Sequence, residues 1–206
     1  MDRTDQYTPT DPRWAPLDEA LRDHCCADDK ERRDVALIRA FLRQHPGDAH
    51  LRSQSAGHLT GSAFVLDAAG AQVLLLHHRR LDRWLQPGGH GEGELEPRLI
   101  ALREVEEETG LAAAQLRAFP DARILDVDVH AIPARPGEPE HLHLDLRYGF
   151  IAAGGALPRL SEESKALRWV PLQATLPDAD AALIRALCKL GRVSGASSPA
   201  PAGGAP

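Results

Sequence analysis

PGGHGEGELEPRLIALREVEEETGL, residues 87–111, is the stretch of the sequence that decides the fold. Its first half is a glycine-rich turn, and its second half has the composition of a helix. Pro97 suits the first turn of a helix, and Gly110 suits the position just past the end of one. The stretch therefore predicts a helix over residues 97–109 that follows a tight turn.

Three glutamates of this helix are expected on one side of it. Glu104, Glu107 and Glu108 stand at positions i, i+3 and i+4, which share a narrow face at about 100° per residue. The apolar positions fall roughly opposite and are expected to pack on a sheet: Leu95, Leu99, Leu102 and Val105. The pattern predicts one acidic and one apolar side.

The acidic side needs a compensating positive charge, because like charges at this spacing destabilise an isolated helix by about 0.2–0.5 kcal/mol per pair. Arg103, four residues before Glu107, is one source of compensation. A divalent cation is a stronger one, since Mg²⁺ prefers hard carboxylate oxygens. The alternative is an acidic face exposed to solvent. The glycines of residues 88–93 favour a ligand, because they let the backbone approach it closely, as phosphate loops do.

The whole stretch resembles the signature of the Nudix hydrolases, G-x5-E-x7-R-E-U-x-E-E-x-G-U, in which U is a bulky aliphatic residue. Gly89 opens the match, and its closing part keeps the required spacing through Arg103, Glu104, Val105, Glu107, Glu108, Gly110 and Leu111. One position departs, because Leu95 stands where the first glutamate is expected. Glu94 and Glu96 flank it, so a local shift of the loop restores a carboxylate, and Glu94 is our choice.

The similarity extends outward over about residues 57–176. Residues 84–90, WLQPGGH, are similar to the family's entry into this box, and residues 163–170, ESKALRWV, to a late strand entry. The resemblance implies an α/β/α sandwich with a mixed central sheet. Strands and helices also alternate without a strict βαβ order, which favours an α+β or α/β sandwich over a doubly wound sheet.

The resemblance implies that water attacks a phosphorus of a nucleoside diphosphate linked to another moiety. Mg²⁺ or Mn²⁺ would neutralise the phosphates and activate or orient the water. The implied metal ligands are Gly89, Glu104, Glu107 and Glu108. Arg103 would orient them by ion pairing.

The general base would be one of these glutamates or a glutamate from a loop. The catalytic set implied in this way is Arg103, Glu104, Glu107 and Glu163. Glu163 is explained as well by a solvated loop residue, because it lies in the run Ser-Glu-Glu-Ser of residues 161–164.

The rest of the chain frames this domain. Residues 1–13 are expected to be disordered, residues 14–55 to form a helical extension, residues 56–191 the Nudix domain, and residues 192–206 a flexible tail. The extension is expected to hold two helices between residues 17 and 44 that dock on the main domain or on a partner subunit. The other expected elements are strands at residues 62–67, 72–78, 124–132, 142–152 and 167–170, the first two forming a hairpin, and a helix at residues 178–190.

Histidines supply further candidate contacts to a substrate. His141, His143 and Asp145 alternate with leucines, which places the polar side chains and Arg147 on one face of a strand. The ligand role competes with a plain polar face at a cleft or in solvent. His90 follows the glycines, and Arg79 lies in a basic patch near the box. The candidate substrate contacts are therefore Arg79, His90, His141 and His143.

Charge and cysteine content limit the classes of function. The 206 residues include 24 basic and 30 acidic side chains, a net charge of −6, which argues against binding nucleic acid or an anionic membrane. Seven of the glutamates fall within residues 92–108, where only two arginines accompany them. The polar start of the chain and three unpaired cysteines point to a reducing cytoplasm. The resemblance also implies a possible homodimer.

Two other functions compete with the hydrolase. A non-catalytic Nudix-like module that senses a nucleotide would explain Leu95. A diphosphate isomerase of the same superfamily would need a cysteine in the segment entering the box. Cys25 and Cys26 lie instead in the N-terminal helical region, where packing is the simpler explanation.

Overall fold

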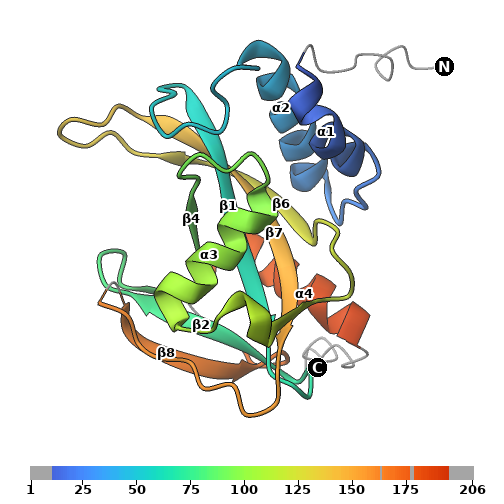
Figure 1. The fold of residues 1–206 in the computed structure, drawn as a ribbon, viewed down its shortest axis with the longest axis vertical. Helices are drawn as coiled ribbons and strands as arrows, with labels where there is room; N and C mark the ends of the chain where they lie inside the picture. Colours follow the sequence, from blue (N-terminus) through green and yellow to red (C-terminus); the bar gives the residue numbers. More distant parts are fainter. Residues whose placement is uncertain (1–10, 163, 177–178, 195–206) are drawn as a thin grey trace, which may run out of the picture.

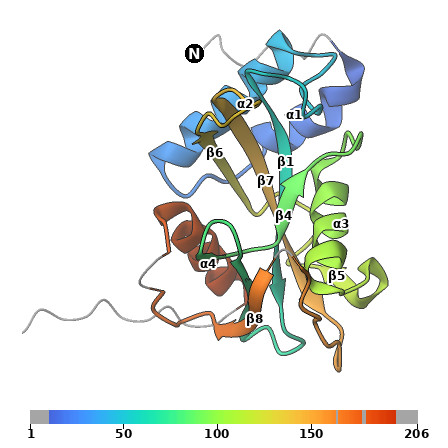
Figure 2. The same ribbon diagram turned by 90° about the vertical axis from the view of Figure 1, so that its left-hand side faces the viewer.

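The computed structural model describes residues 11–162, 164–176 and 179–194. A mixed sheet forms the centre of the molecule, with helix α3 (Pro97–Thr109) on one face and helix α4 (Ala181–Ser194) on the other (Figures 1 and 2). The α+β sandwich predicted from the sequence is confirmed.

The remaining helices precede the sheet. They are η2 (Pro12–Trp14), α1 (Ala15–Arg22) and α2 (Asp29–Gln44), and a short 3₁₀ turn, η3 (Ala113–Gln115), follows α3. The strands are β1 (Gly57–Leu66), β2 (Gln72–His78), β3 (Arg83–Leu85), β4 (Gly88–His90), β5 (Leu116–Ala118), β6 (Asp126–Ile132), β7 (His141–Ala152) and β8 (Ser164–Pro171). Among the described residues no helix has the length and apolar character needed to cross a membrane.

Strands β1 and β7 form the middle of the sheet. They run parallel, in register from Gly57 opposite Leu142 to Leu66 opposite Ile151. The other named pairings are antiparallel: β1 with β2 and β4, β2 with β3 and β8, and β7 with β5 and β6. The single parallel pair makes the sheet mixed, and it places polar residues of two distant segments side by side.

Helix α3 lies very close to β1 because of one glycine. A Cβ added at Gly61 would stand 2.2 Å from the carbonyl oxygen of Pro97 and 2.9 Å from the amide nitrogen of Ala101. The helix begins at Pro97 and ends before Gly110, whose φ of 68° is the left-handed conformation that favours glycine there. The predicted bounds of this helix are confirmed.

We expect Gly61→Ala to lower the free energy of unfolding by about 1–3 kcal/mol, because the new methyl group meets helix backbone that cannot move aside. Urea unfolding measures the loss. Gly154→Ala is the matched control, since a Cβ there meets nothing within 4 Å. Equal effects of the two substitutions would contradict the proposed role of Gly61.

Several expectations about individual elements were wrong. Leu99 is 45% exposed, because the close approach at Gly61 turns the face around Ala101 toward the sheet, and Leu99 lies roughly opposite Ala101. Helix α4 continues to Ser194, beyond the expected start of a flexible tail at residue 192. Residues 11–13, expected to be disordered, take part in the capped turn η2. Residues 1–10 and 195–206 of the two terminal segments lie outside the described residues.

The N-terminal helices share the main hydrophobic core. Trp14, Ile38 and Leu42 are fully buried in one cluster with Leu59 and Leu144 of the central strands. The indole of Trp14 donates a hydrogen bond to the carbonyl oxygen of Pro46 at 2.8 Å. Of the two predicted docking places, the structure shows the main domain.

Helix α2 also covers the edge of β6 with carboxylates. Oε1 of Glu31 accepts a hydrogen bond from the amide of Val127 at 3.0 Å, and Oδ2 of Asp34 accepts one from the amide of Val129 at 3.1 Å. An open strand edge presents unpaired amides, and these two side chains satisfy a pair of them. The extension thereby becomes part of the sheet's hydrogen bonding.

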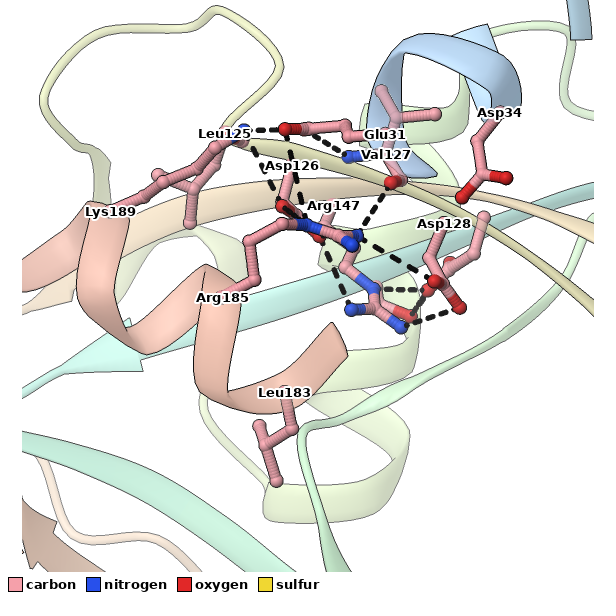
Figure 3. A network of polar contacts seen from close by, with 12 residues as sticks. Glu31, Asp34, Leu125, Asp126, Val127, Asp128, Arg147, Leu183, Arg185 and Lys189 are labelled. Atoms are coloured by element: carbon pink, nitrogen blue, oxygen red, sulfur yellow. Dashed lines mark hydrogen bonds and ion pairs between the residues drawn. The ribbon is translucent and has the colours of Figure 1, made fainter. Parts of the chain in front are cut away.

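A buried ionic network joins this edge to α4 (Figure 3). Arg185 donates to both carboxylate oxygens of Asp126, at 2.8 and 2.9 Å, and Lys189 pairs with Glu31. Burial opposes the charged form of Glu31, but hydrogen bonds from His24, Lys189 and the amide of Ala27 outweigh it and hold the pKa of Glu31 well below its usual range.

We expect Glu31→Gln to lower the free energy of unfolding by about 2–3 kcal/mol at pH 7. A carboxylate whose pKa is lower in the folded chain contributes stability that is complete above its unfolded pKa, and that contribution is lost as the pH falls. The difference between wild type and variant should therefore narrow below about pH 4.5. Urea titrations from pH 7 to pH 3 measure it. Glu19→Gln, at an exposed position of α1, serves as control, and a constant difference across this range would argue against the linkage.

Candidate functional site

The box glutamates lie where α3 faces β4. A Cβ added at Gly89 would stand 2.4 Å from Oε1 of Glu104, so only glycine lets that carboxylate come so near the strand. On the other side of β4, a Cβ at Gly88 would meet Oγ of Ser62 at 2.3 Å. The two glycines of the turn therefore separate an acidic site on the α3 side from the opposite face of the sheet.

The three glutamates differ in their surroundings. Glu108 is buried, and its Oε2 accepts a hydrogen bond from the amide of Gly88 at 2.9 Å. Glu104 keeps 14% of its side chain exposed, whereas Glu107 keeps 53%. Exposure to solvent therefore increases across the predicted acidic face, from Glu108, which is bonded to β4, through Glu104 to Glu107.

Arg103 connects these groups. Its Nη1 lies 3.1 Å from Oε1 of Glu104 and 2.8 Å from Oε2 of Glu107, and its Nε donates to Oε1 of Glu94 at 2.8 Å. Its Nη2 donates to the carbonyl oxygen of His90 at 2.5 Å. Burial disfavours its charge, but these carboxylates outweigh burial and raise the pKa of Arg103. One guanidinium thus fixes two box glutamates, the loop and the end of β4.

Glu94 is the carboxylate that the loop brings to the box. Its pKa lies below the usual range, because the hydrogen bond from Arg103 and nearby backbone amides outweigh the opposing effect of burial. Leu95 packs against the main hydrophobic core. The position where the family pattern expects a glutamate is thus used for packing, while its neighbour carries the charge.

The donor set fits a hard divalent cation. Glu104, Glu107 and Glu108 offer carboxylate oxygens, and the absence of a side chain at Gly89 leaves its backbone accessible beside Glu104. Within the described ranges, however, the box does not place three ligand atoms within 4.8 Å of one another, because Arg103 stands between two of the carboxylates.

Arg79, a predicted substrate contact, is engaged elsewhere in the structure. Arg79 donates to the carbonyl oxygens of Glu162 and Ser164 at 2.9 and 3.1 Å, which ties β2 to the entry of β8. These two hydrogen bonds give its guanidinium a structural role. Glu163 lies outside the described residues.

The predicted histidines gather on the opposite face of the sheet. His143 and His141 of β7 lie beside His58 of β1, and His90 of β4 completes the group. Nε2 of His90 is 3.0 Å from Nε2 of His143. Burial lowers the pKa of His58 to about 4, with a further contribution from His141. It likewise lowers the pKa of His90 to about 4 and that of His143 to about 2, so these three rings are neutral near pH 7.

His58 was not among the predicted site residues. The pairing of the strands could have identified it, because the parallel register of β1 with β7 places His58 directly opposite His143. The polar residues that follow on each strand also meet: Oγ of Ser62 and Oγ1 of Thr60 both donate to Asp145, at 2.8 and 3.1 Å. The polar face predicted from the alternation in β7 exists, but it is buried at Asp145 and Arg147 instead of solvated.

The structure thus holds a glutamate-bearing helix against a glycine-containing strand of a mixed sheet. The family model described as NUDIX domain matches residues 58–189. The chain therefore belongs to the Nudix family, as the resemblance of the box implied.

Among curated proteins, the chain is similar to a probable DHNTP pyrophosphohydrolase of Lactococcus lactis subsp. cremoris (strain MG1363). The two are 28% identical over 112 residues, which is 54% of this chain and 66% of that relative. The match thus spans slightly less than two thirds of the relative's length. This likeness agrees with the family match, which places the chain in the Nudix family.

Solved structures show the same fold. An Ap4A hydrolase of C. elegans, in a binary complex, superposes with a TM-score of 0.53 at 22% identity, over 65% of this chain and 95% of that one. The Nudix hydrolase RenU of M. smegmatis superposes with a TM-score of 0.50 at 22% identity, over 68% of this chain and 87% of that one. The α/β/α arrangement of the prediction is confirmed by these likenesses.

Proposed function

We propose that this protein is a divalent-metal-dependent hydrolase that cleaves a phosphoanhydride bond of a nucleoside diphosphate linked to another moiety. The observation that carries the proposal is the placing of Glu104 against Gly89, with Arg103 bridging Glu104 and Glu107. This arrangement concentrates negative charge beside backbone that a phosphate can approach. Both features are needed for a diphosphate neutralised by metal.

Each residue of the box has its own proposed role in the reaction. Glu104, Glu107 and Glu108, with the backbone of Gly89, would hold Mg²⁺ or Mn²⁺, which when bound neutralises phosphate charge and makes water a better nucleophile. Arg103 keeps Glu104 and Glu107 in position through its ion pairs. Glu107 is the exposed carboxylate and thus the member of the box best placed to accept a proton from attacking water, with Glu163 as the second candidate.

The other proposed features concern substrate and setting. The sequence-based substrate contacts His90, His141 and His143 lie on the sheet face opposite the box, so as contacts they are proposed only for a part of the substrate that reaches that face. Arg79 is a weaker candidate, because two carbonyl groups already accept hydrogen bonds from it. Cys25, Cys26 and Cys188 are free thiols in the described part of the chain, which supports a cytoplasmic location. A homodimer is proposed only on the resemblance to the family.

The similar proteins support the type of reaction more strongly than the identity of the substrate. The names of two of them refer to DHNTP and to Ap4A. The proposal for this chain accordingly specifies the phosphoanhydride bond and leaves the attached moiety to be measured.

The test is a phosphate-release screen of the full chain over nucleoside diphosphate derivatives. Each reaction is run with Mg²⁺, with Mn²⁺ and with a chelator, beside Glu107→Gln. Hydrolysis that needs the metal and falls sharply in the variant supports the proposal. Equal inactivity of wild type and variant, with both still binding a nucleotide, would replace it with the non-catalytic sensing module.

We expect Glu94→Gln to slow hydrolysis by about 10- to 100-fold, the usual cost of removing a residue that orients metal ligands. The reason is that Arg103 loses its loop partner and is free to pull Glu104 and Glu107 out of position. Steady-state rates at saturating Mg²⁺ measure the effect. Glu92→Gln is the control, because Glu92 is exposed on the same loop; a loss of similar size there would show that Glu94 has no special role.

A further inference from the structure

We propose that His58, His90 and His143 form a second metal site, separate from the box glutamates and selective for borderline transition ions such as Zn²⁺. The ligands come from three strands, β1, β4 and β7, that meet on the sheet face opposite α3. One nitrogen from each ring lies within 4.8 Å of the others. The site depends on nothing in the proposed hydrolytic reaction.

The spacing of the rings suits an ion shared between them. Nε2 of His90 and Nε2 of His143 are 3.0 Å apart. Tetrahedral Zn²⁺ with bonds of 2.0–2.1 Å holds neighbouring ligand nitrogens about 3.3 Å apart, so a small rotation of either ring admits the ion. The centroids of the His58 and His90 rings lie 5.0 Å apart, and those of His58 and His143 lie 5.1 Å apart. All three rings therefore surround one point.

His58 is the independent observation that points to a ligand. Its side chain is 1% exposed, and within the described part of the chain neither ring nitrogen has a hydrogen-bond partner. The backbone of Gln54 approaches the ring closely enough to favour its protonation, but without the geometry of a hydrogen bond. A buried polar group without a hydrogen-bond partner destabilises the fold, and coordination of an ion would remove that cost.

His141 adds a fourth imidazole beside the three. Its Nδ1 lies 2.8 Å from the carbonyl oxygen of Pro139, a contact that makes Nδ1 the donor and leaves Nε2 with its lone pair. Nε2 of His141 is buried and has no hydrogen-bond partner among the described residues, with Oε1 of Glu138 4.0 Å away. A hydrogen bond from the far nitrogen to a carbonyl is the usual way in which proteins orient a ligating histidine.

Ligand chemistry separates this site from the box. Neutral imidazole nitrogens suit Zn²⁺, Cu²⁺, Ni²⁺ or Fe²⁺, whereas Mg²⁺ takes oxygen ligands. His90 and His143 are only half-buried, which gives an ion a path from solvent. Three protein ligands leave a fourth position, which is open to water or to Nε2 of the neighbouring His141.

Occupancy would have a consequence for the box. His90 follows Gly89 directly, and its carbonyl oxygen accepts a hydrogen bond from Arg103 at 2.5 Å. An ion held by His90 would fix the three-residue strand β4 to the two central strands. The second site would then stiffen strand β4, against which the glutamates of helix α3 lie.

The experiment uses the full chain stripped of metal by a chelator. Zn²⁺ and Mg²⁺ are titrated separately by calorimetry, and Co²⁺ is added as a probe because its visible absorption reports tetrahedral nitrogen coordination. The variants are His143→Gln, the control His130→Gln, and Glu107→Gln. His130 is a good control because it lies opposite His143 on β6, with ring centroids 5.4 Å apart, but is not one of the three ligands. Thermal unfolding of each variant establishes that it is folded.

We expect wild type, His130→Gln and Glu107→Gln to bind one Zn²⁺ per chain with similar affinity and to give the tetrahedral Co²⁺ spectrum. His143→Gln should bind Zn²⁺ at least about 100-fold more weakly and lose the spectrum while remaining folded. The proposal is overturned if wild type binds no more tightly than His143→Gln, or if Glu107→Gln abolishes the binding instead. Should His143→Gln fail to fold, His90→Gln, at a half-buried position, takes its place with the same expected loss.

Discussion

Glu104→Gln is expected to slow phosphate release by about 10²- to 10⁴-fold, the largest effect on activity among single changes in the box. The substitution keeps the size of the side chain and removes its charge. A charged ligand to a catalytic cation contributes several kcal/mol to the transition state, and each 1.36 kcal/mol is a factor of ten in rate. Glu104 combines the contact with Gly89, the ion pair with Arg103 and a largely buried position, so solvent cannot replace it.

Glu106→Gln is the matched control, because Glu106 lies two residues away on the same helix and is exposed. Its rate should stay within about twofold of wild type. Both variants should unfold at similar urea concentrations, which separates loss of chemistry from loss of fold. A comparable loss of rate in the two variants would show that the overall charge of the helix matters, and not the particular position of Glu104.

Helix α3 is predictable from the sequence because its ends are determined locally. Pro97 and Gly110 act within one turn of themselves, so no distant partner is needed to place them. Its inward face is less predictable. The contact of Gly61 with Pro97 and Ala101 joins segments far apart in the sequence, and it is this contact that leaves Leu99 in solvent.

The histidine face shows a second limit of sequence patterns. Alternation in β7 correctly separates the polar from the apolar side chains, since that depends only on strand geometry. It does not tell which of the two faces will be buried. Here both are, because Asp145 and Arg147 are enclosed by partners from β1 and β6 that no local pattern links to them.

The arrangement of the box is less predictable from the sequence than the ends of helix α3 and more predictable than the histidine face. Its spacing predicts which glutamates share a helix face, and the structure gathers them beside β4. The choice of Glu94 over Glu96 depended on the path of the loop. Arg103 contacts Glu94, whereas Glu96 pairs with Arg98 at 2.9 Å, so the geometry favours Glu94. The catalytic roles stay predictions until rates are measured.

Arg147→Met is expected to lower the free energy of unfolding by about 3–5 kcal/mol, the largest effect on stability. Arg147 lies 3.3 Å from both Asp126 and Asp128 (Figure 3). It also lies 2.8 Å from Asp145, and all four side chains are buried. Methionine fills much of the same volume but removes one buried positive charge. Asp126 keeps Arg185 and Asp128 keeps Lys30, whereas Asp145 loses its ion pair. Breaking a buried ion pair carries a cost of this size. Urea unfolding at pH 7 measures it.

Arg123→Met is the control for this loss, because Arg123 pairs with Asp121 at the same 2.8 Å but with 86% of its side chain exposed. Exposed ion pairs contribute about 0–1 kcal/mol to stability. If the N–O distance alone mattered, both substitutions would lower the free energy of unfolding equally. If burial matters, Arg147→Met should lower it much more than Arg123→Met. A further measurement tests the cause. If the missing positive charge accounts for the loss, protonation of the buried carboxylates should offset it, and the difference in free energy of unfolding between wild type and Arg147→Met should shrink as the pH falls toward 4. A gap that stays constant would assign the loss to packing instead of charge.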